Sequence, residues 1–148
     1  MNNLNLGFIG VGLMGLSLVK RLSYLGYKID AYDKNLKKLE PLKKISNVRL
    51  NQKASEVSQN NNIIILCVDK TESVKEVVFG KYGIVNNANN NTIILDLSTT
   101  LANETIEFAN QLKKTGASWI DAPVSGGPDK ALEGNLAIMV GGDEEVVE

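Results

Sequence analysis

The chain has 148 residues, 43% of them hydrophobic and 22% charged, with a formal net charge of -1 at pH 7, which is typical of one globular domain. It contains no histidine and one cysteine, Cys67. These counts exclude Ser-His-Asp and Cys-His catalysis, an internal disulfide and a zinc ion bound by histidines or several cysteines. We therefore expect no metal site, and the balanced charge argues against a nucleic-acid partner.

Short apolar runs alternate with stretches of helical spacing in the first half of the chain. Apolar residues recur in steps of three over 13–25, which predicts a helix, and Gly26 is placed to end it. The stretch 36–45 has a helical pattern that Pro41 interrupts. The other predicted elements of this half are strands at 4–9, 27–32, 48–50 and 63–68 and a short helix at 54–59.

The second half continues this alternation. Its predicted elements are helices at 71–79 and 103–115 and strands at 92–97, 119–124 and 136–140. The order predicts an α/β fold, a doubly wound and mostly parallel sheet of the Rossmann type, as one dinucleotide-binding domain over residues 1–148. Residues 143–148 have the composition of a helix start, with nothing after them to bury Val146 and Val147, so we expect a longer protein.

The apolar runs indicate neither a membrane span nor a signal peptide. The run 63–68 is far shorter than the roughly 20 residues that a membrane helix needs. The N-terminal apolar run has no basic region before it, and glycines interrupt it. We expect a cytoplasmic protein with no membrane partner.

A glycine motif, GxGxxG, occupies residues 10–15, between the first predicted strand and the first predicted helix. This is the context in which the motif binds a dinucleotide. The first glycine allows a tight turn, the second admits a pyrophosphate, and the third lets helix and strand pack closely. The helix N-terminus adds free N–H groups and a positive dipole end. The predicted cofactor-binding residues of this loop are Gly10, Gly12, Leu13, Met14 and Gly15.

An acidic residue, Asp33, ends the second predicted strand, 18 positions after Gly15. This spacing is close to the roughly 20 residues expected for the carboxylate that binds the adenosine ribose. A carboxylate there repels a 2'-phosphate, so the sequence favours NAD over NADP. Lys34 and the lysines after it leave NADP open, because they could neutralise that phosphate or form a solvated surface.

Four spaced segments resemble the β-hydroxyacid dehydrogenases, specifically the branch of 3-hydroxyisobutyrate dehydrogenase and tartronate semialdehyde reductase. GFIGVGLMG and AYDKN are similar to the cofactor loop and the end of the second strand of that family. DLSTT is similar to its D-x-S-T segment, and DAPVSGGPDKALEGNLAIMVGG resembles its substrate loop and the following strand. The resemblance extends over the whole chain and implies its N-terminal, NAD-binding domain.

The resemblance also implies site residues. Thr99, just past a strand end, matches a threonine that contacts the cofactor near the nicotinamide, although it could also cap the next helix. Val68 is expected beside the adenine-side ribose. The family usually has Leu-Pro at the positions of Val68 and Asp69, so this chain differs from the family there. Ser125, Gly126 and Gly127 are expected to bind a substrate carboxylate through backbone N–H groups and a hydroxyl.

The chemistry implied by this family is hydride transfer between a nicotinamide cofactor and a small 3-hydroxy acid or semialdehyde. The family's proton-transferring lysine lies in a later helical domain, which places it beyond Glu148. We therefore expect no catalytic residue within this chain and little turnover by it alone. The resemblance implies a homo-oligomer at full length. Two alternatives are open: an enzyme resembling 6-phosphogluconate dehydrogenase, and a non-enzymatic nucleotide-binding module on the same scaffold.

Overall fold

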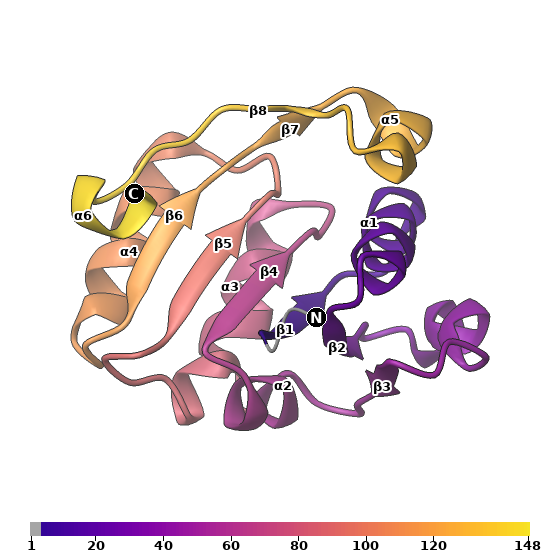
Figure 1. Cartoon of the computed structure of the whole chain (residues 1–148). Helices are drawn as coiled ribbons and strands as arrows, with labels where there is room; N and C mark the ends of the chain where they lie inside the picture. Colours follow the sequence, from indigo (N-terminus) through magenta and orange to yellow (C-terminus); the bar gives the residue numbers. More distant parts are fainter. Residues whose placement is uncertain (1–3) are drawn as a thin grey trace.

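A computed structural model describes residues 4–148 as a parallel six-stranded sheet with helices on both faces (Figure 1). The strands lie in the order β3-β2-β1-β4-β5-β6, so the chain reverses direction across the sheet between β1 and β4. Their bounds are β1 (Asn5–Ile9), β2 (Lys28–Tyr32), β3 (Val48–Leu50), β4 (Ile63–Leu66), β5 (Ile93–Asp96) and β6 (Ser118–Asp121). The doubly wound, Rossmann-type α/β fold predicted from the sequence is confirmed.

The connecting segments are mostly helical. The α-helices are α1 (Leu13–Tyr24), α2 (Ala54–Asn60), α3 (Thr71–Phe79), α4 (Ala102–Lys113), α5 (Gly127–Glu133) and α6 (Glu144–Val147). Two short 3-10 helices are η1 (Leu36–Leu42) and η2 (Ile84–Asn86), and a small antiparallel pair is formed by β7 (Val124–Ser125) and β8 (Ala137–Ile138). None of the helices in the described part of the chain is long and apolar enough to cross a membrane.

The sheet is buried on both faces, which explains the unbroken apolar sequence of β4. Ile64 and Leu66 point into a core shared with α2, α3 and α4, whereas Ile65 points into a core shared with α1 and η1. Alternate residues of a strand point to opposite faces. Asp96 on β5 is in phase with Ile94, and Asp121 on β6 is in phase with Trp119, so both carboxylates belong to the α3 and α4 face.

Several predicted elements differ from the structure, and of the predicted strand 136–140 only the two-residue β8 forms. The stretch 36–45 is a 3-10 helix that ends at Leu42, because Pro41 has no N–H for an α-helical hydrogen bond. The predicted strand 63–68 ends at Leu66, and the predicted strand 119–124 divides into β6 and β7 just before Pro123. Gly26 follows the last turn of α1 with φ +91°, and this left-handed conformation ends the helix as predicted.

The last six residues form the helix start that their composition predicts. The Asp143 side chain caps α6. Earlier parts of the chain partly bury Val146, which packs against the core beside β6, whereas Val147 is 43% exposed. Glu148, the residue beyond which the catalytic lysine is expected, is exposed, and its N–H donates to the Glu144 carbonyl at 3.1 Å.

Helix α5 has no counterpart among the predicted elements, because the glycines before it favour a loop. Pro128 stands in its first turn and Gly134, in the left-handed conformation, ends it, which is the usual position of each residue type around a helix. The helix packs against α1, and Figure 1 shows the two side by side at the right of the molecule. This packing brings the segment after β7 alongside α1, and Gly134 at the end of α5 lies next to Arg21.

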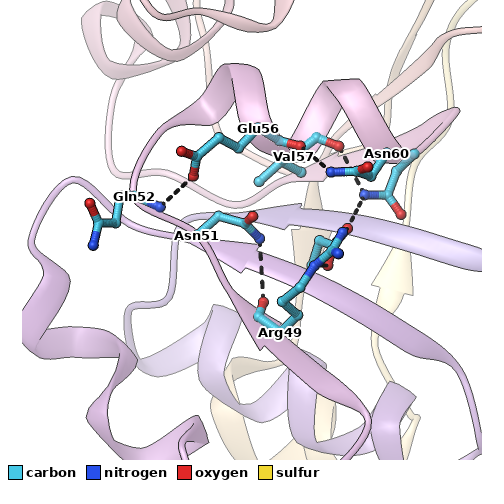
Figure 2. A network of polar contacts seen from close by, with 8 residues as sticks. Arg49, Asn51, Gln52, Glu56, Val57 and Asn60 are labelled. Atoms are coloured by element: carbon cyan, nitrogen blue, oxygen red, sulfur yellow. Dashed lines mark hydrogen bonds and ion pairs between the residues drawn. The ribbon is translucent and has the colours of Figure 1, made fainter.

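A polar network fastens the amino-terminal edge of the sheet (Figure 2). The Arg49 guanidinium donates two hydrogen bonds to the Asp30 carboxylate, at 2.6 and 2.7 Å, and joins β3 to β2. Asn61, just after α2, donates through its amide to Asp30 at 2.7 Å and to the Val57 carbonyl at 2.8 Å. A cavity of about 510 Å³ lies beside this network, and the predicted cofactor-binding residues lie at the opposite, carboxyl-terminal edge of the sheet.

Candidate functional site

A cavity of about 430 Å³ lies at the carboxyl ends of β1, β2 and β4, where doubly wound sheets bind their ligands. Its walls come from the glycine loop, the ends of β2 and β4, and helix α3. Eight of the predicted cofactor-binding residues line it: Gly10, Gly12, Leu13, Met14, Gly15, Asp33, Lys34 and Val68.

The three motif glycines face different surroundings. Gly10 has φ +99°, and a Cβ there would overlap the Cys67 carbonyl, so the turn leaving β1 needs glycine. A Cβ at Gly15 would overlap the Gly10 carbonyl oxygen, which explains how α1 starts so close to β1. Gly12 is different, because no atom lies within 4 Å of a Cβ built there. Gly12 therefore borders open space in the cavity.

Backbone N–H groups are available at the same place. Leu16 is the first residue of α1 whose N–H forms a helical hydrogen bond. It donates to the Gly12 carbonyl at 2.8 Å. Within residues 4–148, no acceptor takes a hydrogen bond from the N–H groups of Gly12, Leu13, Met14 and Gly15. Such free groups at the positive end of a twelve-residue helix favour an anion, above all a phosphate.

Asp33 is only 7% exposed and is fixed by two backbone contacts. The Val11 N–H donates to its Oδ2 at 2.8 Å, and the Asn35 N–H donates to its Oδ1 at 2.8 Å. An ionised carboxylate can accept about four hydrogen bonds, so each oxygen retains capacity for a further donor. Next to it, burial raises the pKa of Tyr32, with smaller contributions from the charges of Asp33 and Glu76.

Basic side chains stand at the rim of the cavity. Lys34 and Lys38 line it and are exposed, whereas Lys43 forms an exposed ion pair with Glu40 at 2.6 Å. The lysine-rich segment after β2 is therefore a solvated surface with two of its members beside the cavity. Opposing them, the carboxylates of Asp33, Asp69 and Glu76 also line the cavity.

The segment after β4 carries the departure from the usual Leu-Pro. Asp69 accepts a hydrogen bond from the Ser73 hydroxyl at 2.6 Å, and this bond lowers the pKa of Asp69. The contact joins the loop to the first turn of α3. Val68 is half-buried, and its N–H donates to the Ser98 hydroxyl oxygen at 3.0 Å.

Cys67, expected inside a strand, follows the end of β4 and lines the cavity half-buried. Burial, followed by the charge of Asp96, raises the pKa of its thiol to about 11. The thiol is therefore protonated near neutral pH and is a poor nucleophile.

The far wall of the cavity was not predicted. Ser73, Glu76 and Val77 supply it from one face of α3, and their spacing of three and four positions was a detectable signal. Tyr82 completes the wall, with the Lys53 ammonium 4.5 Å from the centre of its ring. Nothing in the sequence around Tyr82 indicates this position, since it depends on the packing of a loop.

The remaining predicted residues lie outside the cavity. Thr99 is exposed beyond the end of β5 and does not cap α4, which begins after Leu101, so the alternative capping role is wrong. Ser125 ends β7, and Gly126 and Gly127 follow it with φ +140° and +79°. Thr99 follows β5, whereas Ser125, Gly126 and Gly127 lead from β7 into α5, which lies beside α1 (Figure 1).

The structure does not test the position expected for the catalytic lysine. Its expected place, beyond Glu148, lies outside the described residues, which run from Leu4 to Glu148. The expectation that this chain itself holds no catalytic residue therefore stays a prediction.

Comparison with known proteins shows what this arrangement is similar to. Residues 5–148 match the family of the NAD binding domain of 6-phosphogluconate dehydrogenase. The chain is 37% identical over 145 residues to 2-hydroxy-3-oxopropionate reductase from Escherichia coli (strain K12), which is 98% of this chain and 49% of that protein.

Two solved structures extend the comparison. The fold matches Mycobacterium tuberculosis 3-hydroxyisobutyrate dehydrogenase with L-serine at a TM-score of 0.88 and 26% identity, covering 97% of this chain and 48% of that one. It matches Psf3 in complex with NADP+ and 2-OPP at a TM-score of 0.90 and 25% identity, covering 95% and 50%. The chain thus spans about half the length of these proteins. The chain belongs to the family of the NAD-binding domain of 6-phosphogluconate dehydrogenase, and its resemblance to the 3-hydroxyisobutyrate dehydrogenase branch is confirmed.

Proposed function

We propose that the cavity at the carboxyl ends of β1, β2 and β4 binds NAD, and that the full-length protein is an oxidoreductase acting on a small 3-hydroxy acid or semialdehyde. The observation that carries the proposal is the open space in front of Gly12 beside the free N–H groups that open α1. A pyrophosphate fits there without a cationic side chain, because backbone donors and the helix dipole supply the attraction.

Asp33 supports the choice of NAD over NADP. The lone pairs left on its carboxylate suit ribose hydroxyl donors, and its charge opposes a 2'-phosphate. Asp69 and Glu76 also line the cavity, as do the exposed lysines Lys34, Lys38 and Lys81, so the preference rests on the position of Asp33 and not on the net charge of the cavity. We propose Lys34 and Val68 as further contacts of the adenosine half, and Thr99 as a contact near the nicotinamide.

The substrate half of the proposal rests on family resemblance. Ser125, Gly126 and Gly127 are proposed to bind the substrate carboxylate, and the consecutive left-handed glycines turn the backbone so that neighbouring N–H groups are available there. A bound nicotinamide would supply the hydride chemistry. We propose that the proton-transferring lysine lies beyond Glu148 in a longer protein, which is a cytoplasmic homo-oligomer.

The alternative enzyme resembles 6-phosphogluconate dehydrogenase, the protein after which the matching family is described. That branch usually carries Asn-Arg after its second strand, where this chain has Asp33-Lys34. The difference favours the 3-hydroxyisobutyrate dehydrogenase branch over the 6-phosphogluconate dehydrogenase branch.

The test is a steady-state assay of the full-length protein with NAD+ or NADP+ and four substrate classes: hydroxyisobutyrate, glycerate, the product of succinic semialdehyde reduction, and 6-phosphogluconate. We expect turnover of an unphosphorylated acid with NAD+. Preference for 6-phosphogluconate would establish the alternative enzyme. Tight nucleotide binding without turnover of any substrate, and without a lysine in a K-x-x-x-N pattern after Glu148, would establish the non-enzymatic module.

A further inference from the structure

Two acidic side chains stand next to each other at the carboxyl ends of β5 and β6, outside the cavity. Asp96 and Asp121 are register partners on these adjacent parallel strands, so their side chains project to the same face of the sheet. Asp96 is completely buried. Within residues 4–148, neither Oδ2 of Asp96 nor the buried Oδ1 of Asp121 has a hydrogen-bond partner. Unsatisfied buried carboxylate oxygens are costly, and such a pair calls for a functional explanation.

A chain of hydrogen bonds leads from Asp96 to the cavity. The Ser98 N–H donates to Oδ1 of Asp96 at 3.0 Å. The Ser98 hydroxyl oxygen in turn accepts from the Val68 N–H at 3.0 Å, and Val68 lines the cavity. Ser98 is only 3% exposed, so water does not readily replace these contacts.

We propose that Asp96 is a positioning residue for the nucleotide site: its carboxylate holds Ser98, Ser98 holds the Val68 backbone, and a proton taken up by the Asp96–Asp121 pair loosens this connection. The effect on nucleotide affinity rests on the proposed function of the cavity. The effect on the Val68 backbone does not, because it concerns the contacts within this chain.

The protonation of the pair falls in an accessible pH range. Burial and, to a smaller extent, the charge of Asp121 raise the pKa of Asp96 to about 6, against the opposing hydrogen bonds from Ser98. Burial also raises the pKa of Asp121. Asp96 is therefore ionised above about pH 6 and protonated below it. A carboxylate accepts a hydrogen bond about twice as strongly as a neutral oxygen, so the hold on Ser98 weakens as the pH falls.

Other ionisable groups of this region lie after β4 and on the two helices that pack on this face of the sheet. The Cys67 thiol after β4 interacts with the charge of Asp96 and, with its pKa raised to about 11, stays neutral. Helices α3 and α4, which pack on this face, carry Glu72 and Glu104 in their first turns. Glu72 is exposed and Glu104 is half-buried.

The first test follows the wild-type chain by NMR from neutral to mildly acidic pH. We expect the side-chain carboxyl carbon of Asp96 and the amide proton of Val68 to titrate with one shared midpoint at about pH 6. Ser98→Ala is expected to abolish the response of Val68 while Asp96 still titrates. A Val68 amide that stays constant while Asp96 titrates would overturn the proposal, and this result needs no Asp96 variant to fold.

The second test measures NAD+ affinity by calorimetry over the same pH range. We expect the wild-type Kd to rise about fivefold on acidification, as for the weakening of one charge-assisted hydrogen bond. Asp96→Asn is expected to flatten this dependence, and Glu107→Gln, an exposed change on α4, to leave it as in the wild type. An Asp96→Asn variant with the wild-type pH dependence contradicts the proposal. Failure to bind NAD+ at every pH, with the Val68 response intact, contradicts only the proposed function of the cavity.

Discussion

Alanine at Gly12 is expected to abolish nucleotide binding and to leave the fold intact. The backbone of Gly12 is extended, with φ -75° and ψ -165°, and a Cβ there meets no protein atom within 4 Å. The same Cβ would occupy the space proposed for the pyrophosphate. We expect the Kd for NADH to rise more than about 100-fold, with the free energy of unfolding lowered by about 1 kcal/mol or less, the usual cost of alanine at an N-cap.

Alanine at Gly15 is expected to act in the opposite way, through the fold. Its Cβ would overlap the Gly10 carbonyl oxygen and would lie 3.2 Å from the Phe8 ring, so α1 must move away from β1. We expect the free energy of unfolding to fall by about 3 kcal/mol or more, as for overpacking a core, together with loss of NADH binding. Urea denaturation and calorimetry with NADH measure both quantities.

Gly26→Ala is the matched control for this pair. Gly26 has φ +91° with open space around it and does not line the cavity. The substitution should cost about 1–2 kcal/mol of stability through backbone strain and leave the Kd for NADH unchanged. NADH binding by Gly12→Ala at wild-type affinity would refute the position assigned to the pyrophosphate.

Asp33→Asn is expected to reverse or narrow the preference for NADH over NADPH. The amide removes the negative charge and one acceptor oxygen, so either the Val11 or the Asn35 N–H loses its partner. We expect NADH affinity to fall about tenfold, the value of one hydrogen bond to a charged group, and NADPH affinity to fall less or to rise. Calorimetric titration of one preparation with both nucleotides gives the ratio of the two Kd values.

The ratio of the two Kd values distinguishes loss of ribose recognition from disorder of the loop. A disordered loop would weaken the binding of NADH and of NADPH to the same extent. Asp129→Asn, an exposed change of the same charge on α5, should leave the ratio as it is in the wild type. An Asp33→Asn variant with an unchanged ratio would show that this carboxylate does not contact the ribose.

The elements that local sequence determines were predicted well. The bounds of α3 agree with the predicted 71–79, and the strands of the parallel sheet agree within two residues at each end except where β6 and β7 divide. Their signals are local, since an apolar period or a capping residue acts within one element. Helix α5 was missed although Pro128 and Gly134 mark its ends, because the glycines before it favoured a loop.

The candidate site likewise combines residues that the sequence predicts with residues that it does not. The glycine loop and Asp33 were predicted because one strand–turn–helix unit and one neighbouring strand bring them together. The contacts of Tyr82 and the pairing of Asp96 with Asp121 depend on sheet register and loop packing between distant segments. No short pattern in the sequence encodes these contacts, because only the folded chain brings the segments together.

The most direct test of the proposed nucleotide site is an NMR titration of this chain with NADH, followed through the backbone amides. We expect the amides of Gly12, Leu13, Met14 and Gly15 to shift along one common binding curve, since these N–H groups are free to donate to the pyrophosphate. The amide of Asn61, at the opposite edge of the sheet, should stay in place. Saturating NADH that leaves the four loop amides unshifted would contradict the assignment of this loop as the pyrophosphate site.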